Sequence, residues 1–245
     1  RVTLELGGKS PNLVFADCDL EARVAASVRE CMFNTGQSCD APTRLLVERS
    51  CYGEALRIAK QTADSITVGD PTQEGDHIGP LFDKIQYDRV QAMIKVGLAE
   101  GATLLAGGPG RPEGLAKGWF VKPTIFADVS NDMRIAQEEI FGPVLVIIPF
   151  ADEAEGIAIA NDTPYGLAAY LQTGDLERAQ RIATRLRAGA IQGAAVLIPG
   201  HQTHTTAATA ITAGRPDRAP SPPRRQTCRH LLVSRHRDPH QPGQS

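Results

Sequence analysis

The sequence lacks the features that mark membrane-spanning, secreted and zinc-binding proteins. No apolar run reaches about 18 residues, so no transmembrane helix is predicted. The first residues are not a basic segment followed by an apolar one, as in a signal peptide. The five cysteines are odd in number and none forms a Cys-x-x-Cys pair, which argues against a disulfide framework or a zinc site. These absences favour a cytoplasmic protein without membrane contact. Because the chain begins with Arg1 and not Met, we expect it to start partway through a longer protein or to be processed.

The last part of the chain lacks the residues that build a core. Residues 193–245 contain no Lys, Glu, Phe, Tyr or Trp, and they hold seven of the 17 prolines. Their seven Arg and two Asp give a net charge of +5, which leaves −7 on residues 1–192 of a chain whose total is −2. Without aromatic anchors or sustained periodicity, this tail is predicted to be disordered.

Two features of the tail could suggest ligands. His201 and His204 have a spacing typical of metal ligands, but no third ligand accompanies them, so no metal site is predicted. The arginines near Arg224 and Arg225 are scattered among prolines, which favours a solvated segment over a nucleic-acid site. An abrupt change into Arg, Pro, His, Thr and Ala is what a shifted reading frame in a GC-rich gene produces. We hypothesise such a shift after codon 192, and the encoding nucleotides would test it.

Residues 1–192 alternate between strand-like and helix-like segments. The 42% hydrophobic content is sufficient for a sizeable core. Asp17 and Asp19 are expected to mark the start of a helix. Apolar residues at helical spacing follow them and include Cys31, which we expect to be packed and inert. Residues 144–150 form an uninterrupted apolar strand of the kind buried on both faces of a sheet. The alternation predicts an α/β protein with a mostly parallel sheet and flanking helices.

Further expectations concern the ends of individual elements. Ser50 is expected to cap a helix over residues 51–66, and residues 175–188 are expected to form one helix. The glycines of residues 107–112 follow a strand but do not open a helix, so they predict a surface turn and not a phosphate-binding loop.

Three short stretches carry chemically active side chains. Residues 33–39 form a polar, glycine-containing turn that ends on Cys39 just past an amphipathic helix. Residues 4–11 place Glu5 inside an apolar run before a glycine pair, and burial of this kind raises the pKa of a carboxyl group. Residues 137–144 place two acids and Phe141 before an apolar strand. A lone cysteine is more often a buried, inert residue, and a lone glutamate is more often an exposed acid.

Taken together and in this order, the three stretches resemble the glutamate, cysteine and cofactor motifs of the aldehyde dehydrogenase superfamily. The resemblance runs from residue 1 to about residue 192 and then stops. It implies a catalytic domain over residues 1–192, with residues 193–245 outside the family pattern. It also implies oxidation of an aldehyde to a carboxylic acid with NAD or NADP, in an enzyme that is a homo-oligomer when complete.

The resemblance assigns a role to each site residue. Cys39 would be the nucleophile that forms a thiohemiacetal and then a thioester, and Glu5 would be the base that activates water to release the acid. Glu139 would bond the nicotinamide ribose, and Phe141 would pack near the nicotinamide ring. The backbone of Leu6 would contact the nicotinamide amide, and Gln86 would touch the other ribose. For Glu138 a solvated or structural role is expected.

Two observations leave alternatives open. The residue after the nucleophile is Asp40, where the family usually has a small or apolar residue, and its charge would raise the thiol pKa. In the family, the dinucleotide domain and an asparagine that binds the oxyanion precede the glutamate motif, and the present sequence begins at that motif. The alternatives are therefore an inactive fragment, or an enzyme that passes the thioester to coenzyme A and does not need Glu5.

Overall fold

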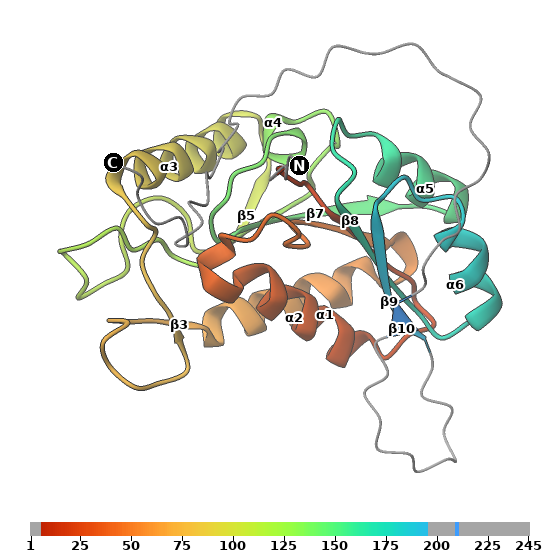
Figure 1. Cartoon of the computed structure of the whole chain (residues 1–245), viewed down its shortest axis with the longest axis horizontal. Helices are drawn as coiled ribbons and strands as arrows, with labels where there is room; N and C mark the ends of the chain where they lie inside the picture. Colours follow the sequence, from red (N-terminus) through yellow and green to blue (C-terminus); the bar gives the residue numbers. More distant parts are fainter. Residues whose placement is uncertain (1–5, 196–208, 211–245) are drawn as a thin grey trace, which may run out of the picture.

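The computed structural model describes residues 6–195 and 209–210 (Figure 1). Several sequence-based expectations concern residues outside this range. They are the role of Glu5, the histidine pair His201 and His204, the arginines near Arg224, and nearly all of the tail that is predicted to be disordered. These expectations stay predictions.

A mostly parallel sheet forms the centre of the molecule (Figure 1). The strand order is β10-β9-β8-β1-β2-β7-β6-β5, and only the β5–β6 and β9–β10 pairs are antiparallel. A second, separate sheet consists of the parallel pair β3 and β4. The strands are β1 (Pro11–Val14), β2 (Arg44–Glu48), β3 (Thr67–Val68), β4 (His77–Ile78), β5 (Thr103–Ala106), β6 (Thr124–Ala127), β7 (Val144–Phe150), β8 (Ala168–Thr173), β9 (Ala190–Ala195) and β10 (Thr209–Ala210).

Helices cover both faces of the sheet (Figure 1). They are α1 (Leu20–Met32), α2 (Tyr52–Ser65), α3 (Lys84–Ala99), α4 (Arg134–Gln137), α5 (Glu153–Asn161) and α6 (Leu176–Ala183), with short 3-10 turns η1 (Phe33–Gly36) and η2 (Arg49–Cys51). Helices α1 and α2 pack together on one face, and the other helices lie on the opposite one. The predicted fold class, an α/β protein with a mostly parallel sheet, is confirmed.

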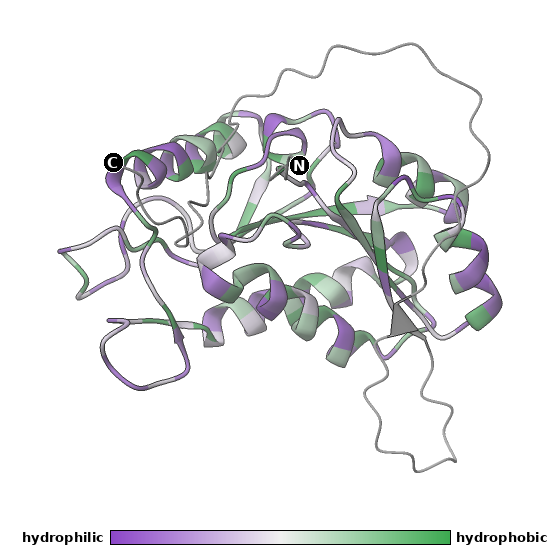
Figure 2. Ribbon diagram, viewed as in Figure 1, coloured by the Kyte–Doolittle hydropathy of each residue, from purple (hydrophilic) through white to green (hydrophobic). Residues whose placement is uncertain are grey.

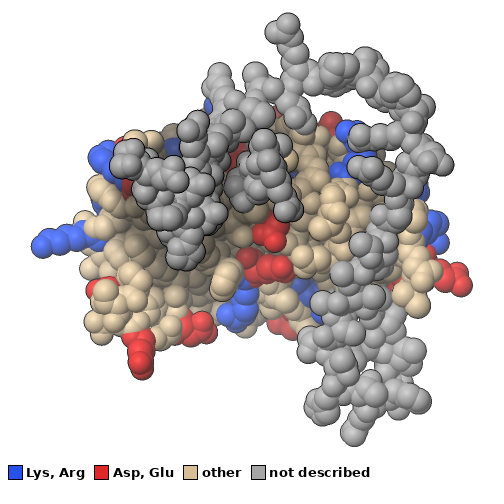
Figure 3. All heavy atoms as spheres, viewed as in Figure 1, with Lys and Arg blue, Asp and Glu red and all other residues tan. Residues whose placement is uncertain are grey.

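The two faces of the sheet belong to two separate cores. Within β2, Leu46 packs into the core under α3 to α6, whereas Leu45 and Val47 pack into the core under α1 and α2. This alternation follows from the opposite directions of successive strand side chains. Figure 2 shows that the central strands are rich in apolar residues, and most of these residues are buried. On the face shown in Figure 3, side chains of both charge signs are scattered among a majority of other residues.

Several predicted boundaries are confirmed and others are wrong. Asp19 caps α1 by accepting a hydrogen bond from the N–H of Ala22, and Cys31 is fully buried as expected. No side-chain hydrogen bond caps α2, whose cap position is Cys51, so the prediction for Ser50 is wrong. The glycines after β5 do form a turn, with φ of 74° at Gly107.

The helix predicted over residues 175–188 ends at Ala183. Asn161 accounts for this early end, because its amide donates to the carbonyl of Arg185 and its oxygen accepts from the N–H of Arg187. These bonds hold the chain in an irregular segment that leads into β9. Strand β9 itself continues to Ala195, past the predicted boundary at residue 192.

Candidate active site

A left-handed turn positions the segment that contains Cys39. Three successive residues after α1 have positive φ: 50° at Asn34, 60° at Thr35 and 68° at Gly36. The hydroxyl of Thr35 donates to the carbonyl of Gly79 at 2.9 Å, which fixes this unusual backbone. A side chain at Gly36 would overlap the backbone of Gly142, so only glycine fits here. The turn thus joins the cysteine motif to the cofactor motif through backbone contact.

Cys39 lies half-buried between this turn and β2. Its carbonyl oxygen sits against Gly8 so closely that a Cβ at Gly8 would overlap it. The N–H of Ala41 donates to the carbonyl of Ser38 at 3.2 Å and closes a tight turn around the cysteine. The backbone of Cys39 is therefore held directly beside the glycine pair of the glutamate motif.

Glu139 reaches the same glycine pair from the other side. Its Oε1 accepts a hydrogen bond from the N–H of Gly8 at 3.1 Å, and a Cβ at Gly7 would overlap its carboxylate. The backbone of Glu139 is fixed as well, because its carbonyl accepts from Arg89 at 2.7 Å and its N–H donates to the hydroxyl of Tyr165 at 3.3 Å. Motifs that lie far apart in sequence thus converge at Gly7 and Gly8.

Gln86 stabilises the cofactor motif through two hydrogen bonds. Its side chain is buried, and its amide donates to the carbonyls of Ile140 at 2.8 Å and Phe141 at 2.7 Å. Phe141 has a φ of 55°, so these bonds stabilise a backbone that a bulky residue rarely adopts. In this structure Gln86 stabilises the turn at Phe141. Its expected contact with a ribose stays a prediction.

The remaining predicted residues lie at the edges of this arrangement. Leu6 is 51% exposed and directly precedes Gly7, while Phe141 is half-buried. Glu5 lies outside the described residues, so its position relative to Cys39 is not part of this geometry.

Sequence reasoning missed two buried cations beside the site. Lys9 is 1% exposed, and within the described residues its Nζ has no hydrogen-bond partner. Burial, and then the nearby charge of Arg44, lower the pKa of Lys9 to about 7. Arg44 is fully buried and donates to the carbonyl of Lys9 at 3.0 Å. A basic residue at the first position of a strand whose next three residues are apolar was the signal that could have revealed Arg44.

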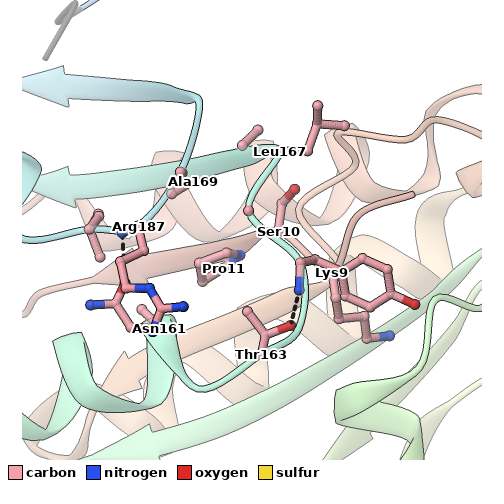
Figure 4. Close-up of a pocket in the computed structure, with 14 residues that line it drawn as sticks. Lys9, Ser10, Pro11, Asn161, Thr163, Leu167, Ala169 and Arg187 are labelled. Atoms are coloured by element: carbon pink, nitrogen blue, oxygen red, sulfur yellow. Dashed lines mark hydrogen bonds between the residues drawn. The ribbon is translucent and has the colours of Figure 1, made fainter. Parts of the chain in front are cut away.

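A small cavity lies near the start of β8, with room for about one water molecule. Its lining includes Lys9, Ser10, Asn161 and Thr163 (Figure 4), but neither Cys39 nor Glu139. It therefore does not form part of the cysteine site. In the described part of the chain, no helix is long and apolar enough to cross a membrane, and no cluster of three or more His, Cys, Asp or Glu could hold a metal ion.

The fold and the three converging motifs define an α/β protein in which a cysteine lies beside a glycine pair, and the carboxylate of Glu139 is hydrogen-bonded to the same pair. Residues 1–203 match the aldehyde dehydrogenase family, and the chain belongs to this family. The resemblance seen in the sequence is thereby confirmed.

Individual relatives show the extent of the similarity. The chain is 53% identical over 191 residues to 3-succinoylsemialdehyde-pyridine dehydrogenase of a Pseudomonas species, which covers 78% of this chain and 40% of that protein. Aldehyde dehydrogenase C of Pseudomonas syringae was solved as a cysteine-to-alanine mutant with NAD+ and octanal. It superposes with a TM-score of 0.76 at 48% identity, over 82% of this chain and 41% of its own.

A second solved relative, the indole-3-acetaldehyde dehydrogenase of P. syringae in complex with NAD+ and IAA, gives a TM-score of 0.76. It is 45% identical over 79% of this chain and 39% of its own. The chain thus spans about 40% of the length of the relatives it matches.

Proposed function

We propose that this chain carries the catalytic part of an NAD(P)-dependent aldehyde dehydrogenase, with Cys39 as the nucleophile and Glu5 as the base. One observation carries the proposal: the backbone of Cys39 and the carboxylate of Glu139 meet at the same glycine pair. A nucleophile and a ribose-binding carboxylate must lie this close if a hydride is to pass from the substrate to a nicotinamide. Two of the solved relatives contain NAD+, which agrees with this arrangement.

In the proposed reaction, the thiolate of Cys39 adds to the aldehyde carbonyl and forms a tetrahedral thiohemiacetal. The backbone N–H of Cys39 would stabilise the oxyanion. When bound, NAD(P)+ supplies the hydride acceptor, and loss of hydride from the thiohemiacetal leaves a thioester on Cys39. Glu5 then takes a proton from water, which attacks the thioester, and the products are the carboxylic acid and the free thiol.

The chain offers residues that fit the nicotinamide end of the cofactor. A carboxylate has about four acceptor positions, and the N–H of Gly8 occupies one on Glu139. Glu139 can therefore accept from the two hydroxyls of a ribose while it stays fixed. Phe141, the backbone of Leu6 and Gln86 are proposed to complete this end of the site, in the roles that the family resemblance implies.

Hydrolysis of p-nitrophenyl acetate tests the proposal, because acylation of Cys39 and attack by water require no nicotinamide. We expect slow turnover by the chain, no turnover by Cys39→Ser, and normal turnover by the control Cys18→Ser. Glu5→Gln should release one equivalent of p-nitrophenol and then stop, with the acyl group retained on Cys39 in a mass spectrum.

The outcomes separate the alternatives. Inactivity of the folded chain toward the ester would identify a non-catalytic protein. An acyl group that persists in the unchanged chain and leaves only when coenzyme A is added would identify acyl transfer to coenzyme A. Turnover that survives Cys39→Ser would contradict the assignment of the nucleophile.

A further inference from the structure

Asp40 places a negative charge directly beside the proposed nucleophile. Its Oδ1 accepts a hydrogen bond from the hydroxyl of Ser38 at 2.8 Å, so the carboxylate is tied to the residue on the other side of Cys39 in sequence. Ser38, Cys39 and Asp40 are all half-buried. Because Asp40 directly follows Cys39, its carboxylate contributes negative charge next to the proposed nucleophile.

The backbone of Asp40 is anchored to the sheet. The hydroxyl of Tyr170, on β8, donates to the carbonyl of Asp40 at 3.0 Å. Tyr170 is 4% exposed, so this bond is largely protected from water. The turn at residues 38–40 is therefore fixed at both its side chain and its backbone, and the carboxylate cannot rotate away without breaking a bond.

A second acid strengthens the negative field at this position. Glu30, on the last turn of α1, is exposed, but partial loss of hydration raises its pKa, and the charge of Asp40 raises it further. Burial also raises the pKa of Tyr170, and the charges of Glu30, Asp40 and Cys39 act in the same direction. Within the described residues, the charged groups that act on the Tyr170 hydroxyl are all negative.

From this geometry we propose that Asp40, supported by Glu30, makes the Cys39 site selective for charge. The site would favour aldehydes that carry a cationic group near the carbonyl, such as protonated aminoaldehydes, and disfavour aldehydes that carry a carboxylate. This inference rests on the proposed function, since it concerns what approaches Cys39. It assigns Asp40 a role in specificity that the small or apolar residue usual in the family could not have.

The size of the effect follows from Coulomb's law. A unit charge on a substrate about 6 Å from the carboxylate, in surroundings of effective dielectric constant about 40 to 80, changes the rate of approach by about threefold to tenfold. The rates for a cation and an anion should therefore differ by about tenfold to a hundredfold. Salt at about 1 M should remove most of this difference, because the screening length falls to about 3 Å.

Charged thiol reagents test the proposal without a cofactor. Three methanethiosulfonates with a trimethylammonium, a sulfonate or a methyl group differ mainly in charge. In each case the thiolate of Cys39 attacks the sulfenyl sulfur, a disulfide forms, and methanesulfinate leaves. The rate at Cys39 is measured on its own peptide by mass spectrometry and divided by the rate with 2-mercaptoethanol, which corrects for the intrinsic reactivity of each reagent.

We expect the corrected cation-to-anion ratio to be about tenfold to a hundredfold in the unchanged chain. It should fall at least threefold in Asp40→Asn, fall less in Glu30→Gln, and stay unchanged in the control Asp132→Asn. Asp132 is exposed and belongs to none of the three motifs. Because both charged reagents react with the same thiolate, any change in the thiol pKa cancels in the ratio.

Other results would overturn the inference. A corrected ratio near one, a ratio that Asp40→Asn leaves unchanged, or a Cys39 that even the neutral reagent fails to label would each contradict it. Charge-selective labelling in a chain that does not hydrolyse p-nitrophenyl acetate would instead uphold the inference and reject only the proposed function.

Discussion

The carboxylate of Glu139 and the backbone N–H of Gly8 are joined by a hydrogen bond of 3.1 Å, although 131 residues separate them in sequence. The same Gly8 abuts the carbonyl of Cys39. One glycine thus sets the distance between the proposed nucleophile and the proposed cofactor carboxylate. The site depends on close backbone approach as much as on its reactive side chains.

Substitution of Gly8 by alanine should therefore disrupt the site. The added methyl group would overlap the Cys39 carbonyl, which is backbone and cannot simply move aside. We expect a loss of stability of about 1 to 3 kcal/mol from overpacking, together with at least a tenfold loss in the rate at which a neutral thiol reagent labels Cys39. Urea denaturation and peptide mass spectrometry measure the two effects.

The matched control is Gly53→Ala, in α2, where an added Cβ meets no atom within 4 Å. This change should leave labelling unaltered and should stabilise the chain slightly, since alanine is favoured over glycine in a helix. Equal effects of the two substitutions would show that the close approach at Gly8 does not position Cys39.

Gln86 gives a second prediction, which concerns the turn at Phe141. Substitution by alanine would leave the carbonyls of Ile140 and Phe141 without their donor. We expect the free energy of unfolding to fall by about 2 to 4 kcal/mol, because each unsatisfied buried group costs about 1 to 3 kcal/mol. Urea denaturation measures the change.

The control for this prediction is Gln61→Ala, in α2. Gln61 is exposed, and among the described residues its side chain bonds only an exposed arginine, Arg57, at 2.9 Å. Its loss should change stability by less than about 0.5 kcal/mol. If Gln86→Ala lowers stability as little as Gln61→Ala does, other contacts hold the turn at Phe141. A direct contact between Gln86 and the cofactor would then be the better explanation of its role.

The sequence revealed those features that depend on local patterns. The continuous apolar run of β7 indicates a strand buried on both faces, and the helical spacing of apolar residues around Cys31 indicates a helix buried on one face. Both were predicted correctly. The helix cap at Asp19 is equally local.

Long-range contacts could not be predicted in the same way. No local signal indicates that Gly8 pairs with Glu139 or that the Gln86 amide serves Ile140 and Phe141. The early end of α6 arises from Asn161, which lies more than 20 residues upstream. Such features require knowledge of which segments meet in space, and for this chain only the family resemblance brought the three motifs together beforehand.

Arg44 provides a third prediction, because it connects β2 to several other segments. Its guanidinium donates to the carbonyls of Lys9, Ile159 and Ala160 and to the side chain of Asn131, at 2.8 to 3.0 Å. Substitution by lysine keeps the charge but cannot supply the same planar set of donors. We expect Arg44→Lys to lower the free energy of unfolding by about 3 kcal/mol or more.

Thermal and urea denaturation measure this loss against the exposed control Arg49→Lys, which should have almost no effect. A loss below about 1 kcal/mol for Arg44→Lys would mean that a single ammonium can replace the guanidinium. The network of carbonyls around Arg44 would then contribute little to the position of β2.

Lys9 provides the last prediction, on the pH dependence of stability. Its pKa is lowered by burial from 10.5 to about 7 in the folded chain. Below pH 7 both the folded and the unfolded chain carry the proton, and Lys9 contributes a constant cost. Between pH 7 and about 10.5 the unfolded chain binds more protons than the folded one, so stability due to Lys9 rises with pH. Above that range both states are neutral and the rise ends.

We expect the free energy of unfolding, measured in urea, to increase by about 1 to 3 kcal/mol between pH 7 and pH 9, from this group alone. Lys9→Met removes the buried amine and retains much of its volume, so it should abolish this rise and stabilise the chain at pH 7. The exposed control Lys95→Met should keep the rise. Because other groups titrate in the same range, the decisive quantity is the difference in slope between the two variants. Parallel slopes would show that the buried amine of Lys9 keeps its proton in the folded chain.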